Sequence, residues 1–97
     1  MSDAVFRALA DPQRRKILKL LQKGALSAGE IATRFDVSAG TLSYHFNLLK
    51  DAGLVRCERQ GQKLMYSLNT AVLEELAAMV LDLFQGPQPR GRRAWTR

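Results

Sequence analysis

The 97-residue sequence contains one cysteine, one histidine and no long run of apolar residues. The single cysteine, Cys57, cannot form a disulfide within the chain, which fits a reducing cytoplasm. No apolar run approaches the roughly 18 residues that span a bilayer, and the N-terminus lacks the pattern of a secretory signal. We therefore expect a cytoplasmic protein without stable membrane insertion.

Residues and motifs typical of enzyme active sites are also scarce. With one histidine and one cysteine, the motifs provide no pair of base and nucleophile, and no glycine-rich phosphate loop is present. We therefore expect a chain that is not an enzyme.

Positive charge is in excess, with 15 Lys and Arg against nine Asp and Glu. Four arginines and no acid lie in residues 86–97, so the remaining chain is only slightly basic. Such an excess suits a polyanionic partner, which includes DNA, RNA and an anionic membrane surface. Binding of nucleic acid by the folded part then requires its basic residues to be concentrated on one face.

Helix signals dominate the first half of the chain. A short helix around residues 5–9 is followed by Asp11-Pro12, an N-cap residue and a proline that start a helix over 12–23. The outer face of that helix is predicted to carry its basic residues, Arg14 among them. Ser27 and Glu30 form a capping box for a helix over 29–35, and Ser38 caps a helix over 39–52 that ends at Gly53.

The periodicity then changes to that of strands. Residues 54–59 and 63–68 predict two strands joined by a short loop that contains Gly61. Val55, Cys57, Met65 and Leu68 are the candidates for their buried face. A last helix is predicted over 71–84, and Gly86-Pro87 ends it.

This order predicts a mostly α fold with a small β-hairpin (α+β), which is a winged helix-turn-helix. We expect residues 1–85 to form a DNA-binding and dimerisation domain and residues 86–97 a flexible, arginine-rich tail. The tail can seek phosphates or have no specific role.

The helix over 39–52 is the candidate reading helix. A helix that enters the major groove exposes small and hydrogen-bonding side chains near its N-terminus, and the alternative is an ordinary solvated face. Ser38, at the N-terminus, is a candidate phosphate anchor. The candidates for DNA contact on the exposed face are Gly40, Thr41, Ser43, Tyr44 and Asn47.

His45, on the flank of this helix, has two interpretations of similar weight. It can reach a base or a phosphate, or it can lie at the edge of the core beside Leu42 and Phe46. We include it among the DNA contacts because the resemblance described below favours that interpretation.

Long cationic and polar side chains surround the predicted hairpin tip. Arg59, Gln62 and Lys63 could reach phosphates or a minor groove, although charges also protect edge strands from pairing. We favour DNA contact because no acid separates the two cations.

The last helix has more apolar positions than so small a core needs. A seam in which the first and last helices of two chains meet would cover them, and the alternative is packing within one chain. The predicted homodimer interface consists of Val5, Leu9, Val72, Leu76, Val80 and Leu83.

An ordered series of motifs resembles the ArsR-type transcriptional repressors. The series is DP-x-RRKIL, S-x-x-E-IA, S-x-x-T-LS-x-H, L-x-x-AGLV and QG-x-x-x-YSL, within residues 4–84. Within that family the chain is most similar to the small sporulation-delay autorepressor (SdpR) group. The resemblance implies a homodimer that binds a palindromic operator on double-stranded DNA and blocks transcription. In the resembled group a membrane protein can sequester the repressor, so a protein partner is one hypothesis for induction.

Many relatives in that family sense metals, and here the sequence departs from the pattern. The segment LSAGEIATRF lacks the cysteines of one sensing type, and the last helix has Glu74, Glu75 and Asp82 but lacks the histidines of another. Zinc requires about four suitable ligands. We therefore expect neither a metal site nor a cofactor.

Two alternatives stay open. The modest charge of the body also allows a winged-helix module that binds protein or RNA without specific DNA readout. Cys57 is either a redox-sensitive thiol or, more commonly for a lone strand cysteine, a small buried hydrophobe.

Overall fold

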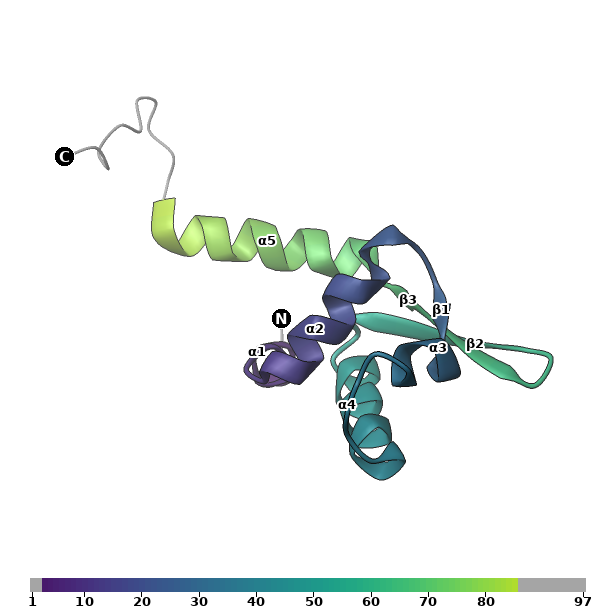
Figure 1. Cartoon of the computed structure of the whole chain (residues 1–97). Coiled ribbons are helices and arrows are strands. Elements are labelled where there is room, and N and C mark those ends of the chain that lie inside the picture. The colour runs from purple at the N-terminus through teal and green to yellow at the C-terminus, as the bar shows by residue number, and fades with distance from the viewer. Residues whose placement is uncertain (1–2, 86–97) are drawn as a thin grey trace.

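The computed structural model describes residues 3–85, and these form a winged helix-turn-helix of helices and one small sheet (Figure 1). In chain order the elements are α1 (Asp3–Leu9), α2 (Pro12–Leu20), the 3-10 helix η1 (Leu21–Lys23), β1 (Leu26–Ser27), α3 (Ala28–Ala32), α4 (Ala39–Asp51), β2 (Val55–Gln60), β3 (Lys63–Leu68) and α5 (Thr70–Gln85). The expected mostly α fold with a hairpin is confirmed. The boundary at residue 85 stays a prediction, because residues 86–97 lie outside the described part.

Three helices begin where the sequence predicts a cap. The Asp11 carboxylate accepts the backbone N–H groups of Gln13 at 2.8 Å and Arg14 at 3.2 Å. Desolvation alone would raise the pKa of Asp11, but these hydrogen bonds outweigh it and hold the pKa below its usual value. Ser27 and Glu30 form the predicted capping box, and the backbone N–H of Ser27 lowers the pKa of Glu30.

The end of α4 is also set by local chemistry. Gly53 has φ +78°, a conformation that favours glycine, and its N–H donates to the carbonyl of Lys50 at 2.9 Å. The N–H of Leu54 donates to the carbonyl of Leu49 at 3.0 Å, which completes a Schellman motif. The buried Leu54 then leads directly into β2.

The sheet has one strand more than the predicted hairpin. Its order is β1-β3-β2, and Leu26 of β1 pairs with Tyr66 of β3. Two residues are too short a segment for alternation to be recognised in the sequence, so β1 was missed.

The register also corrects the predicted buried face. Cys57 pairs with Tyr66, whereas Met65 pairs with Glu58 and so lies on the opposite face. Tyr66 is buried, and its ring stacks on Phe46 of α4 with centroids 4.3 Å apart. Burial, with a smaller contribution from the Cys57 thiol, raises the pKa of Tyr66 to about 12. This aromatic pair attaches the hairpin to α4.

Arg14 is not on the outer face of α2, as the sequence suggested. It is 7% exposed, and its guanidinium donates hydrogen bonds to α1 and α4. Helical periodicity places a basic residue such as Arg14 on the solvent-exposed face. It gives no information about the hydrogen-bond acceptors that neighbouring helices provide.

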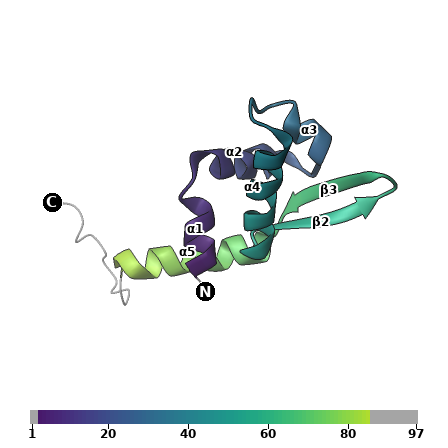
Figure 2. The same cartoon turned by 90° about the horizontal axis from the view of Figure 1, so that it is seen from below.

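The helix α5 and the hairpin of β2 and β3 extend from opposite sides of the helical body (Figure 2). Only Leu76 of α5 is buried, although α5 is 16 residues long. The helical body therefore presents two projecting elements, one helical and one made of strands.

Candidate nucleic-acid interface

The N-terminal part of α4 presents a polar face to solvent. Ala39 to Thr41 follow directly on the turn after α3, and Ser38 caps the helix by accepting the N–H of Thr41 at 3.1 Å. The Ser38 hydroxyl also donates to the Thr41 side-chain oxygen at 2.9 Å. The cap therefore occupies the Ser38 side chain and leaves its neighbouring backbone N–H groups as the candidate phosphate donors.

The expected reading residues share this exposed face. Tyr44 is 59% exposed, and a Cβ added at Gly40 would meet nothing within 4 Å. The packing of the chain therefore does not require glycine at position 40, whereas close approach of an external surface would favour it. The exposed candidates on α4 are Gly40, Thr41, Ser43, Tyr44 and Asn47.

His45 is placed differently from these residues. Its side chain is buried, with 7% exposure, and Nδ1 lies 3.1 Å from Nη1 of Arg14. A side chain enclosed between α2 and α4 cannot reach a base without leaving this site. The expectation of DNA contact is therefore corrected to the structural alternative.

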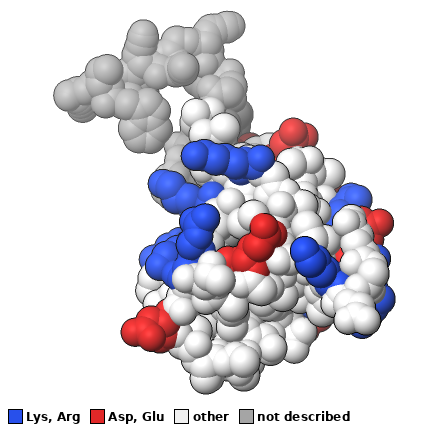
Figure 3. Space-filling model, turned by 45° about the vertical axis from the view of Figure 1, so that its right-hand side comes forward, with Lys and Arg blue, Asp and Glu red and all other residues white. Residues whose placement is uncertain are grey.

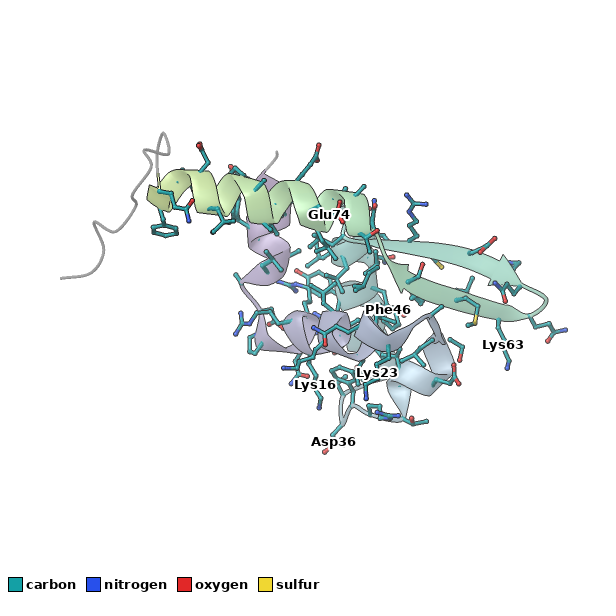
Figure 4. The ribbon with its side chains drawn as sticks, turned by 90° about the horizontal axis from the view of Figure 1, so that it is seen from above. Lys16, Lys23, Asp36, Phe46, Lys63 and Glu74 are labelled. Atoms are coloured by element: carbon teal, nitrogen blue, oxygen red, sulfur yellow. The ribbon has the colours of Figure 1, made fainter. Side chains whose placement is uncertain are left out.

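The hairpin tip carries the remaining candidates. Gln60 pairs with Lys63 across the turn, and Gly61 has φ +65°, which suits a tight hairpin. Arg59, Gln62 and Lys63 are all exposed, and Figure 4 shows Lys63 beside the loop end of the hairpin. After the hydrogen bonds with Ser27, the charge of Lys63 makes a smaller contribution to lowering the pKa of Glu30.

Positive charge does not cover the whole face in Figure 3. Several Lys and Arg side chains follow one another along one edge, and acidic and uncharged surface separates them from the remaining cations. This agrees with a body whose net charge is small once the four arginines of the tail are set aside. The polar face of α4, more than bulk charge, therefore defines the candidate interface.

The predicted dimer residues fall into three groups by exposure. Val5 and Leu76 are already buried within the single chain, so their assignment to a seam is corrected to core packing. Leu9, Val72 and Val80 are half-buried against the core, and Leu83 is 67% exposed. On α1 and α5, three further large apolar side chains are exposed and lie outside the predicted set of interface residues, namely Phe6, Leu81 and Phe84.

Within residues 3–85, no three His, Cys, Asp or Glu side chains come together to hold a metal ion. In the same residues no helix is long and apolar enough to cross a membrane. Cys57 is half-buried opposite Tyr66.

Comparisons with known proteins agree with this geometry. A helix-turn-helix domain model matches residues 9–58. The transcriptional repressor SdpR of Bacillus subtilis (strain 168) is 49% identical over 78 residues, which cover 80% of this chain and 87% of that protein.

Solved structures provide the same answer for the fold. An ArsR-like transcriptional regulator from Rhodococcus sp. RHA1 superposes with a TM-score of 0.73 at 34% identity, over 82% of this chain and 76% of that one. The homodimeric winged helix-turn-helix DNA-binding domain of a Mycobacterium bovis protein has a TM-score of 0.68 at 30% identity, over 89% and 80%. With this order of elements and these relatives, the chain belongs to the ArsR-type family of helix-turn-helix transcriptional regulators.

Proposed function

We propose that the chain is a sequence-specific DNA-binding repressor of transcription. The observation that carries the proposal is the polar, exposed N-terminal face of α4, held between a capped helix and an exposed hairpin. Small and hydrogen-bonding side chains on such a face suit base edges in the major groove. The named function of the Bacillus subtilis relative supports repression.

The residues divide into reading and anchoring groups. Thr41, Ser43 and Tyr44 read base edges, with Gly40 and Asn47 beside them, while the N-terminus of α4 at Ser38 anchors a phosphate. Arg59, Gln62 and Lys63 extend from the hairpin to phosphates that flank the reading helix. Repression follows by occlusion, because a protein seated on a promoter excludes polymerase.

The active form is a homodimer on a palindromic operator. Leu83 and Phe84 are 67% and 70% exposed near the end of α5, and a second copy of the chain would cover them. The homodimeric relative from Mycobacterium bovis supports this assembly. Two copies of α4 then enter major grooves about 34 Å apart on one side of the duplex.

We also propose a cytoplasmic location, because a repressor acts on DNA and the single cysteine suits a reducing compartment. Because the sequence is similar to SdpR, we also propose that a protein partner relieves repression by sequestering the chain. We assign no cofactor or metal.

Selection from random duplex DNA by the full chain tests the function. We expect enrichment of a palindrome whose half-sites are about one helical turn apart. Enrichment of no sequence, together with binding of RNA or of protein at the same surface, would instead support an interaction module without DNA readout.

A further inference from the structure

The buried guanidinium of Arg14 joins three helices. Its Nε donates to the carbonyl of Ala8 at 2.8 Å, and its Nη2 donates to the carbonyl of Arg7 at 3.0 Å. Both carbonyls lie in the last turn of α1, where a cation is favourable. The third contact joins Nη1 to Nδ1 of His45 on α4, at 3.1 Å.

This geometry determines the state of His45. A guanidinium has only donors and keeps its charge, so Nδ1 of His45 must accept the hydrogen bond. The ring is therefore neutral and carries its proton on Nε2. Protonation of Nδ1 would remove the acceptor and put two cations side by side in a buried site.

The contact lies directly behind the reading face. Tyr44 is exposed next to the buried His45, and their ring centroids are 5.9 Å apart. We infer that Arg14 and neutral His45 are positioning residues, which hold the reading helix α4 against α1 and α2 in the orientation needed for specific DNA binding. This inference rests on the proposed function for its DNA readout.

Two charged groups act on His45 besides its own helix. Arg14 opposes protonation, whereas the carboxylate of Asp11, at the N-cap of α2, attracts a positive ring. Asp11 directs its oxygen to the backbone N–H groups of Gln13 and Arg14, while Arg14 contacts the His45 ring directly. The direct contact with Arg14 therefore determines which nitrogen of the His45 ring accepts the hydrogen bond.

Nuclear magnetic resonance of the imidazole nitrogens tests the state of the ring in the full, unmodified chain. Because His45 is the only histidine, its signals need no assignment. At pH 7.5 we expect an unprotonated Nδ1 and a protonated Nε2. A ring with its proton on Nδ1, or one that exchanges between tautomers as free histidine does, would overturn the inference.

A matched pair of variants tests the positioning role. His45→Asn places an oxygen acceptor near the position of Nδ1, whereas His45→Leu has similar size and no acceptor. Loss of a buried hydrogen bond to a charged group costs roughly tenfold or more in an equilibrium constant. We therefore expect the Leu variant to lose about tenfold in preference for the selected operator over scrambled DNA, and the Asn variant to lose less. Helix propensity predicts the opposite order, because Leu is the better helix former.

Equal loss in both variants, or loss of operator and scrambled binding together, would overturn the positioning role. Chemical unfolding of both variants at pH 7.5 provides an independent measurement, because loss of the buried hydrogen bond should destabilise His45→Leu more than His45→Asn.

Equal destabilisation of the two variants would overturn the inference. If selection yields no operator, the proposed function fails, while the imidazole spectrum and the unfolding constants of the two variants still decide whether the Arg14–His45 contact operates.

Discussion

The helices α4 and α5 have similar amphipathic sequences but differ in what covers their apolar stripes. Along α4, Leu42, Phe46 and Leu49 are all buried, and the face left to solvent is polar. Along α5 the stripe continues from Leu76 to Leu83, but only Leu76 is buried, Val80 is half-buried and Leu83 is exposed. Because the apolar stripe of α4 is fully buried, its exposed face is polar and suits a hydrated DNA groove. The apolar stripe of α5 is partly exposed and suits contact with a second copy of the chain.

The largest effect should come from placing charge at the uncovered end of α5. Covering one Leu or Phe side chain stabilises by roughly 1.5–3 kcal/mol, and a dimer covers each position twice. We expect the double variant Leu83→Asp and Phe84→Asp to sediment as a monomer where the wild type is a dimer. Ala78→Asp adds one such charge at an exposed α5 position off the stripe and should stay dimeric. A double variant that sediments like the wild type would contradict the seam at this end.

Core truncation sharpens the same contrast within one chain. Leu49 is fully buried in α4, so Leu49→Ala should cost about 2–5 kcal/mol of unfolding free energy. Leu83→Ala should cost almost nothing in chemical denaturation at concentrations where the chain is monomeric. Similar losses for the two variants would mean that α5 is covered within the single chain.

Truncation of Tyr44 tests whether the polar face of α4 reads sequence. Tyr44→Ala should lose about 1–3 kcal/mol of binding to the selected operator and little to scrambled duplex, because base contacts carry the discrimination. Fluorescence anisotropy with both duplexes measures this, with Glu75→Ala on α5 as the control. Equal losses on both duplexes would remove Tyr44 from the reading face.

The start of α4 should respond to loss of its cap. Ser38→Ala removes the acceptor for the N–H of Thr41 and should cost about 0.5–2 kcal/mol of unfolding free energy. Ser43→Ala, at an exposed position inside α4, is the control and should be neutral or slightly stabilising. Thermal unfolding of both variants measures the difference, and equal values would mean that the cap adds no stability.

The smallest effect is expected at the hairpin. Lys63→Ala or Arg59→Ala should weaken operator and scrambled DNA to the same degree and lower the salt slope by about one for each phosphate that the variant no longer neutralises. Titrations at several salt concentrations measure the slope. If neither affinity nor slope changes, the exposed cations of the hairpin do not contact DNA and only protect the edge of the sheet from pairing.

Local signals in the sequence predicted a large part of this fold. Asp11-Pro12, the Ser27–Glu30 capping box, Ser38 and Gly53 each determine a helix end through bonds within a few residues, and the structure has every one of them. The exposed face of α4 was also predictable, because a helix with a buried stripe must expose the residues opposite to it.

The sequence by itself therefore determined the order of the five helices and the hairpin, the capped helix starts, the end of α4 and the polar face of α4, since these depend on neighbours three or four residues apart. Only the tertiary structure decided that Arg14 and His45 are buried partners, that Tyr66 rather than Met65 faces the core, and that Leu76 belongs to the core while Leu83 does not. Each of those outcomes depends on an acceptor, a strand register or a covering surface supplied by a distant segment. A helical or strand period indicates which residues share a face, but it does not specify what that face meets.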